Sequence, residues 1–203
     1  MSGKSALVLG LVDDVYASVF TRCILMSDTV AYDASVVQLV KTTKHKNIFV
    51  TDEVTNGSIA EIMADQTDLW SKSNQRDTLL LFIDDSGDSA NSKELNKELS
   101  KLFTKSRHVG TSIIVAIQSI SGQLTRKHKG CTTEWIVFRN NMEDLKVLAR
   151  VLSSAFKTEK EVYAYLIAVT EERFSFAYVN TRSSSAKNMY RYCDPVKGFM
   201  DYC

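Results

Sequence analysis

The chain has 203 residues, of which 44% are apolar and 24% charged, and its 25 basic side chains nearly balance 24 acidic ones. This composition excludes intrinsic disorder, and the net charge of +1 excludes a strong global attraction to nucleic acid or anionic lipid. Four scattered cysteines without a C-x-x-C pair argue against a zinc knuckle and favour reduced thiols. No apolar run reaches the ~18–20 residues of a membrane helix, and the start lacks signal-peptide features, so a soluble protein is expected.

The first 75 residues predict helices that alternate with short strands. In chain order, we expect a helix from Ser5 to about Phe20, strands over Cys23–Met26 and Ile48–Thr51, and a helix that contains Ile59, Ile62 and Met63.

Two continuous apolar runs follow, Leu79–Ile83 and Ser112–Ile117, and such runs are typical of strands covered on both faces of a sheet. Between them, Asn91 and Glu94 resemble a capping box at the start of a helix, along which Leu95, Leu99, Leu102 and Phe103 recur at helical spacing. The connection has crossover length, so we expect the two strands to be parallel.

The rest of the chain predicts a strand over 135–138, a helix over 145–152, a helix capped by Thr158 and Glu161, and a period-two strand over 174–178. The polar segment Ser183–Ser185 suggests a loop, and the aromatic tail after it is left unassigned. These elements combine into one three-layer α/β domain over residues 1–203 with a mainly parallel central sheet.

Gly3, Lys4 and Ser5 stand directly before the first helical pattern. They match the end of the phosphate-binding motif G-x-x-x-x-G-K-[ST], in which backbone amides and a helix N-terminus hold phosphates, the lysine adds charge and the hydroxyl binds magnesium. On its own, so short a motif favours an exposed N-terminal turn.

Asp84 and Asp85 directly follow the first buried strand. This order has the form of a Walker B strand, which delivers a carboxylate to magnesium at the carboxyl end of a parallel sheet. A buried carboxylate is costly unless a cation or hydrogen-bond donors meet it. The pair therefore indicates either a metal site or an exposed polar turn, which the following Ser86 and Gly87 also favour.

Arg107 and His108 end the next helix, and Gln118 ends the next strand. We expect these groups to gather with Asp84 along one sheet edge, where open α/β folds bind ligands. An arginine there can neutralise charge on a transferring phosphoryl group. Alternatively, the basic pair complements a helix C-terminus, and Gln118 is a polar strand end.

Three strings in this order and spacing, Gly-Lys-Ser, LLLFIDDSGD and SRHVGTSIIVAIQS, resemble the genome-packaging ATPases of poxviruses and other large double-stranded DNA viruses, within the FtsK/HerA superfamily. The resemblance covers about Ser2 to Asn141 and extends more loosely to FSFAYVN. It implies a RecA-like P-loop NTPase fold with ATP and Mg²⁺ as ligands. It also implies a motor subunit that hydrolyses ATP and translocates double-stranded viral DNA into a preformed capsid.

The resemblance implies roles for single residues. Gly3 and Lys4 would bind the β- and γ-phosphates, and Ser5 and Asp84 would hold magnesium. Asp85 would orient or activate the attacking water, although many relatives carry Glu at that position.

Two further roles follow from the resemblance. Gln118 would sense the γ-phosphate. Arg107 is the candidate arginine finger supplied to a neighbouring subunit, with Arg139 and Arg150 as alternatives.

In such a motor a ring of subunits grips DNA in a central channel, so one small basic loop per subunit can supply the field that a near-neutral chain lacks. The candidate loop is Thr125–Lys129, with Arg126, Lys127 and Lys129, and a second basic cluster comprises Lys41, Lys44, His45 and Lys46. Charge runs are equally typical of solvated surface. The expected partners are double-stranded DNA, a homo-oligomeric ring and a capsid or portal-like protein, with no membrane required, in the host cytoplasm (viral factory) or the virion.

The start of the chain departs from the family, in which a buried strand and an earlier glycine precede Gly3. A fragment, a start codon assigned too late, or a degenerate copy that no longer binds ATP would explain this. An incomplete N-terminus, in which the first strand and the start of the phosphate loop are missing, is favoured by the retained Lys4, Asp84, Asp85 and Gln118. A noncatalytic ring or capsid-associated subunit is the alternative function, and another P-loop protein such as a nucleotide kinase is a third hypothesis.

Overall fold

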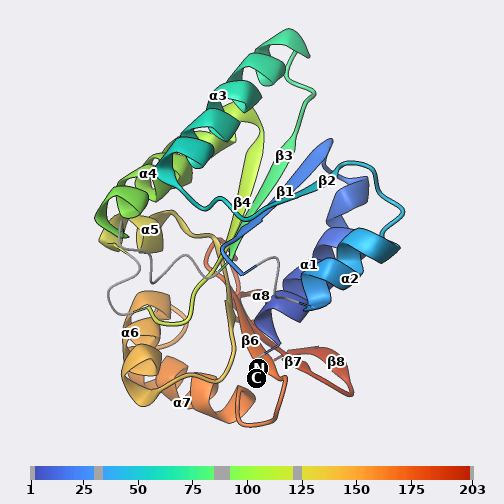
Figure 1. Ribbon diagram of the computed structural model, residues 1–203. Coiled ribbons are helices and arrows are strands. Elements are labelled where there is room, and N and C mark those ends of the chain that lie inside the picture. The colour runs from blue at the N-terminus through green and yellow to red at the C-terminus, as the bar shows by residue number, and fades with distance from the viewer. Residues whose placement is uncertain (1–2, 30–33, 85–91, 121–124, 202–203) are drawn as a thin grey trace. The chain divides into compact units, whose positions relative to one another are not determined.

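The structure of the chain is a computed structural model that describes residues 3–29, 34–84, 92–120 and 125–201 (Figure 1). Its residues divide into two compact units, which we call the first unit (Lys4–Gln118) and the second unit (Met1–Gly3 with Ser119–Cys203). The single domain expected over residues 1–203 stays a prediction.

The first unit alternates helices and strands as the sequence predicts, except that helix α2 was not predicted. Its elements are α1 (Lys4–Asp14), η1 (Tyr16–Ser18), β1 (Arg22–Ser27), α2 (Ala34–Thr42), β2 (Ile48–Thr51), α3 (Asn56–Lys72), β3 (Leu79–Asp84), α4 (Ser92–Lys105), η3 (Ser106–Val109) and β4 (Thr111–Ala116). The four strands form one sheet in the order β2-β1-β3-β4, and every neighbouring pair is parallel. The predicted α/β class and the parallel pairing of the two long apolar runs are confirmed.

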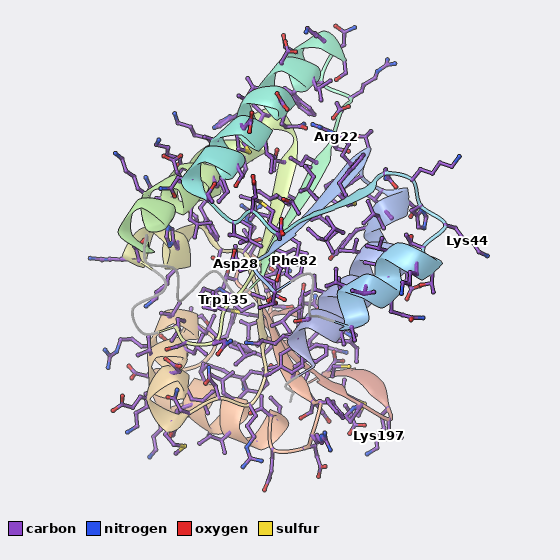
Figure 2. All side chains as sticks on the ribbon, in the orientation of Figure 1. Arg22, Asp28, Lys44, Phe82, Trp135 and Lys197 are labelled. Carbon is purple, nitrogen blue, oxygen red and sulfur yellow. The ribbon has the colours of Figure 1, made fainter. Side chains whose placement is uncertain are left out.

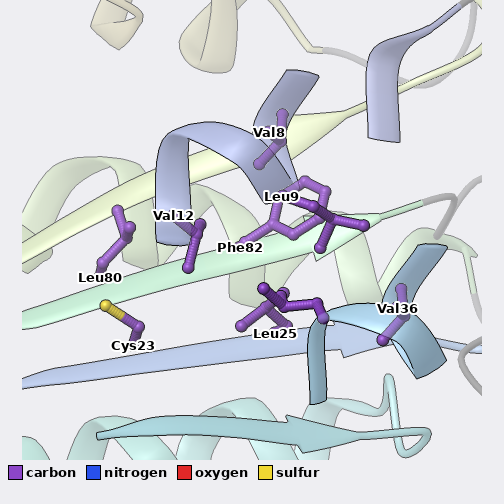
Figure 3. Packing of buried hydrophobic residues seen from close by; sticks show 9 residues of the cluster. Val8, Leu9, Val12, Cys23, Leu25, Val36, Leu80 and Phe82 are labelled. Carbon is purple, nitrogen blue, oxygen red and sulfur yellow. The ribbon is translucent and has the colours of Figure 1, made fainter. Parts of the chain in front are cut away.

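Strand β3 forms the centre of three layers, because its side chains alternate between the two faces of the sheet. Leu80 and Phe82 pack with α1, α2 and β1, as Figure 3 shows at close range. Leu81 and Ile83 pack on the opposite face with residues of α3 and α4. Figure 1 shows the same arrangement, with α1 and α2 on one side of the sheet and α3 and α4 on the other. Each such side chain contributes roughly 1.5–3 kcal/mol when fully buried.

The first helix is shorter than the sequence predicts. It ends at Asp14, because Val15 leaves the helical region with φ −122° and ψ −58°. A single 3₁₀ turn follows, and the rings of Tyr16 and Phe20 pack edge to face. The predicted capping box of Asn91 and Glu94 lies outside what the structure describes.

The second unit differs from the first in its sheet. Its elements are α5 (Arg126–Cys131), β5 (Glu134–Val137), α6 (Met142–Leu152), α7 (Glu159–Val169), β6 (Phe176–Asn180), α8 (Ala186–Met189), β7 (Tyr190–Asp194) and β8 (Gly198–Asp201). The strands follow the order β5-β6-β7-β8, and all three pairs are antiparallel. Short connections between β6, β7 and β8 leave no room for parallel crossovers. The strand expected over 174–178 begins at Phe176, and the unassigned tail forms β7 and β8.

Helix α7 confirms the capping box predicted from Thr158 and Glu161. The Thr158 side chain accepts a hydrogen bond from the Glu161 amide, and the Glu161 carboxylate accepts one from the Thr158 amide at 2.7 Å. The Thr158 hydroxyl also donates to this carboxylate, and these bonds lower the pKa of Glu161.

Within the described ranges, no helix is long and apolar enough to cross a bilayer.

Candidate active site

The first turn of α1 and the end of β3 meet through a hydrogen bond. The Ser5 hydroxyl donates to the Asp84 carboxylate, with 2.9 Å between Oγ and Oδ2. The two residues lie 79 positions apart in the chain, and Asp84 is buried with only 8% of its surface exposed. The fold therefore places the hydroxyl and the carboxylate that the sequence assigned to one magnesium ion in direct contact.

Lys4 reaches the neighbouring strand end. Its ammonium group donates to the carbonyl of Ile117 at 2.8 Å, and Ile117 follows β4 directly. Because Asp84 pairs with Ala116 in the parallel register, this carbonyl and the exposed Gln118 lie just beyond Asp84 along the sheet edge. The structure thus brings four predicted site residues, Lys4, Ser5, Asp84 and Gln118, to the carboxyl end of β3 and β4.

The same edge carries polar groups that the sequence argument missed. Ser27 ends β1, is 4% exposed and pairs with Asp84 in the strand register. Its hydroxyl lies 3.0 Å from that of Thr29. Figure 2 labels Asp28, which lies exposed between them just beyond the end of β1. The signal was present in the sequence, because Ser-Asp-Thr follows the apolar strand as Asp-Asp follows β3.

The donor atoms at this edge fit a hard divalent cation. Hydroxyl and carboxylate oxygens are ligands that Mg²⁺ accepts, and Mg²⁺ is usually held by one or two carboxylates together with substrate phosphates and water. Among the described residues, no group of three or more His, Cys, Asp or Glu could hold a metal ion. Asp85, the candidate for positioning water, lies outside the described residues.

Arg107 does not join this group, and the prediction that it gathers with Asp84 and Gln118 is wrong within one molecule. Arg107 lies exposed in η3, which precedes β4, whereas Gln118 follows β4. The six residues of β4 separate the two by about 20 Å at ~3.3 Å per residue. Figure 2 shows the same two ends of the sheet through Arg22 and Asp28, which lie at opposite ends of β1.

A buried amide holds η3 at that amino end. Gln66 of α3 has no exposed surface, and its Nε2 donates to the carbonyls of Val109 at 2.9 Å and Asp77 at 2.8 Å. Its Oε1 accepts from the Arg22 guanidinium at 2.5 Å. Arg107 is therefore presented from an anchored turn. Arg139 and Arg150 are the alternative candidates for the arginine finger. Arg139 is exposed in the second unit, and Arg150 forms an exposed ion pair with Glu159.

Gly3, the first residue of the Gly-Lys-Ser triplet, belongs to the second unit. Its φ is +82°, which favours glycine, and a Cβ built there would lie 3.2 Å from Cδ1 of Phe174 and 3.7 Å from Cε1 of Phe138. The backbone angle and the close approach of the Phe174 ring therefore both favour glycine at this position.

The candidate DNA-binding residues form part of a short helix rather than the predicted loop. Arg126 and Lys127 are exposed and Lys129 is half-buried on α5, while His128 is fully buried. The Thr125 side chain accepts a hydrogen bond from the His128 amide, and the His128 ring accepts one from the Thr125 amide at 3.3 Å. This reciprocal cap begins the helix that carries the basic side chains.

The second basic cluster lies in the first unit. Lys41 lies in the last turn of α2, and Lys44 and Lys46 lie exposed before β2, at the amino end of the sheet and opposite the Ser5–Asp84 contact.

A sequence model of the family described as "Poxvirus A32 protein" matches residues 2–193. The chain belongs to this family. The match spans the Gly-Lys-Ser triplet, Asp84 and Gln118, and it confirms the predicted resemblance to the poxvirus genome-packaging ATPases of the FtsK/HerA type. No curated protein sequence matches the chain significantly.

Solved structures confirm the fold of this A32 family member. The genome-packaging NTPase B204 of Sulfolobus turreted icosahedral virus 2, in complex with AMPPCP, superposes with a TM-score of 0.58 at 15% identity, covering 96% of this chain and 93% of that one. The DNA-packaging ATPase B204 of Sulfolobus turreted icosahedral virus gives 0.59 at 12% identity with the same coverage. ATPases 2 and 3 of Thermomonospora curvata EccC give 0.50 at 14% identity, covering 85% of this chain and 30% of that one. At these identities the likeness shows the P-loop NTPase fold.

Proposed function

We propose that the chain is a motor subunit that hydrolyses ATP and translocates double-stranded DNA into a preformed capsid. The observation that carries this proposal is the contact between Ser5 and Asp84, which joins the first turn of α1 to the end of β3. Membership of the A32 family and the packaging NTPases among the similar structures support it.

In this proposal the residues at the sheet edge have different roles in the binding and hydrolysis of ATP. Gly3 and Lys4 bind the β- and γ-phosphates, since a backbone amide and an ammonium group both favour negative charge. Ser5 and Asp84 hold Mg²⁺, which when bound neutralises charge that develops on the transferring phosphoryl group. The Lys4 ammonium, which rests on the Ile117 carbonyl, is free to turn toward a phosphate because that carbonyl is a neutral acceptor.

The neighbouring groups complete the site. Asp85 orients the attacking water, and Gln118 senses the γ-phosphate from the end of β4. Arg107 cannot reach these groups in its own chain, so it serves the nucleotide of an adjacent subunit in a homo-oligomeric ring. There it neutralises charge on the transferring phosphoryl group.

Contact with DNA falls to Arg126, Lys127 and Lys129 of α5. One copy adds three positive charges, and repetition around the ring multiplies them into a continuous basic track. This arrangement agrees with a chain whose net charge is only +1. The ring acts in the viral factory of the host cytoplasm or in the virion, with a capsid or portal-like protein as its partner.

Replacement of Asp84 tests the proposal. Asp84→Ala removes the carboxylate that holds the metal, so Mg²⁺-dependent ATP hydrolysis should fall about 100-fold or more, as expected when several kcal/mol of charge stabilisation are lost. The measurement is steady-state phosphate release with and without double-stranded DNA. Asp52→Ala is the matched control, since Asp52 is exposed beyond β2 at the same sheet edge.

Hydrolysis that persists at the wild-type rate in Asp84→Ala would refute the metal assignment. A wild-type chain that binds ATP without hydrolysing it would instead favour the noncatalytic ring subunit.

A further inference from the structure

Gln66 occupies a position of α3 where the sequence pattern predicts an apolar side chain. It lies seven residues after Ile59 and four after Ile62, and both of these pack on the face of the sheet that α3 covers. Gln66 is nevertheless an amide without exposed surface. A buried amide costs free energy unless its donors and its acceptor are paired, so an apolar residue of similar size would suffice for packing alone.

The hydrogen bonds of Gln66 explain why an amide stands at this position. Both hydrogens of Nε2 are used, toward the carbonyls of Asp77 at 2.8 Å and Val109 at 2.9 Å. Oε1 accepts from the Arg22 guanidinium at 2.5 Å, and Nε of that guanidinium lies 3.4 Å from the Asp77 carboxylate. One side chain of α3 therefore joins the start of β1, the segment before β3 and the turn η3.

The bond to Val109 fixes the turn that carries Arg107. Val109 is the last residue of η3, and Arg107 lies two positions earlier in the same turn. The Gly110 amide closes the turn by donating to the Ser106 carbonyl. The Arg107 side chain itself is exposed, so burial does little to hold it in place. The position of Arg107 therefore depends on the backbone of η3, which Gln66 anchors from the buried side.

We infer that Gln66 is a positioning residue for Arg107 when this arginine acts on the nucleotide of an adjacent subunit. The inference rests on the proposed function of Arg107, and it adds a residue that neither the sequence motifs nor the family match assigns. An arginine that reaches across a subunit boundary needs a fixed backbone, because a displacement of about 1 Å can lower a rate about 100-fold. Gln66 acts through the backbone of η3 and does not touch the nucleotide.

The test uses mixed rings in which each subunit has one role. Arg107→Ala subunits keep their own Lys4 but need an arginine from a neighbour, whereas Lys4→Ala subunits supply the arginine and cannot turn over ATP themselves. Gln66→Met added to the Lys4→Ala subunit should lower the restored hydrolysis about 10–100-fold through kcat, with KM for ATP unchanged. The same change added to the Arg107→Ala subunit should leave the restored hydrolysis unchanged. Steady-state phosphate release measures both arms, with mixing shown by native mass spectrometry.

Gln66→Glu provides a second variant of nearly the same size. Its ionised carboxylate still accepts from Arg22 but cannot donate to the Val109 carbonyl, so the same difference between the two arms is expected. Ser73→Ala is the matched control. The Ser73 hydroxyl accepts from the Asp77 amide at 2.9 Å, and its recorded hydrogen bonds do not involve η3. In the Lys4→Ala subunit this control should leave the restored hydrolysis unchanged.

Two results would overturn the inference about Gln66 alone. The first is full rescue by Lys4→Ala subunits that also carry Gln66→Met or Gln66→Glu. The second is an equal loss in both arms, which would show that Gln66 only stabilises the fold. The subunits with native Gln66 test the proposed function separately. If Lys4→Ala subunits do not rescue Arg107→Ala subunits in mixed rings, Arg107 is not the shared arginine, and the role of Gln66 fails with it.

Discussion

Cys23 illustrates how burial sets the chemistry of a single side chain in this protein. Its thiol lies in the core between β1 and the layer of α1 and α2, as Figure 3 shows, and no part of the residue is exposed. Loss of solvation raises the pKa of this thiol to about 11. Because the thiolate is the nucleophile, Cys23 is inert near neutral pH, whereas Cys131 is exposed at the end of α5.

Alkylation with iodoacetamide at pH 8 should therefore label Cys131 rapidly and Cys23 slowly. A rise in the pKa from 9.0 to about 11 lowers the thiolate fraction about 100-fold, and burial slows access further. Mass spectrometry of the peptides over time gives the two rates, and labelling in denaturant provides the reference for full access. Equal rates in the native protein would show that Cys23 is not enclosed as described.

At the scale of elements, Gly110 joins η3 to β4 in a conformation that no other residue fits well. Its φ is +63°, and a Cβ there would lie 2.1 Å from Cζ3 of Trp70 on α3. The Gly110 carbonyl also accepts a hydrogen bond from the Leu79 amide at the start of β3. This junction therefore fixes α3, η3 and two strands together, and it determines where Arg107 emerges.

Gly110→Ala should lower the free energy of unfolding by about 2–4 kcal/mol, from the left-handed backbone and the contact with Trp70. Gly130→Ala is the control, because nothing lies within 4 Å of a Cβ at that position in α5. The control should be neutral or slightly stabilising, as alanine favours helix over glycine. Urea denaturation of both variants measures the difference. Equal stability of the two variants would contradict the packing of Trp70 on Gly110.

The sequence predicted the first unit well because its strands are continuous apolar runs between amphipathic helices. The position of Arg107 was predictable too, since a residue between a helix and the next parallel strand lies at the amino end of the sheet. The second unit was harder to predict from the sequence. Strands β7 and β8 lie in the tail that was left unassigned, and the pattern Phe-Ser-Phe placed Phe174 inside a strand. In the structure Phe174 has a φ of +69°, which arises from hydrogen bonds of the folded turn that no local pattern encodes.

At the scale of the whole molecule, the two ends of the parallel sheet carry different chemistry. The carboxyl end carries Lys4, Ser5 and Asp84, and the amino end presents Arg107. A separation of about 20 Å along β4 means that one chain cannot combine them at one nucleotide. An assembly that places the amino end of one copy beside the carboxyl end of the next would do so, and a heterologous contact of this kind generates a ring when its rotation closes.

Mixed rings test this division. Arg107→Ala subunits alone should lose at least about 1,000-fold in ATP hydrolysis, the effect of an absent arginine finger. Addition of Lys4→Ala subunits, which lack the phosphate ligand but keep Arg107, should restore turnover in proportion to the mixed interfaces. Phosphate release across the mixing ratio is the measurement, with mixing shown by native mass spectrometry. Absence of rescue in mixed rings would exclude Arg107 as the shared group.

Strand β3 also affects how readily the newly synthesised chain aggregates before it folds. Leu79–Ile83 is five consecutive apolar residues, each at most 2% exposed in the fold, and such a segment stacks between chains when it is left unpaired. Charged residues bracket it, with Arg76 and Asp77 before it and Asp84 and Asp85 after it. Charges at these positions oppose intermolecular strand pairing before the flanking strands have formed. The carboxylates proposed for magnesium and water therefore also act as gatekeepers against aggregation.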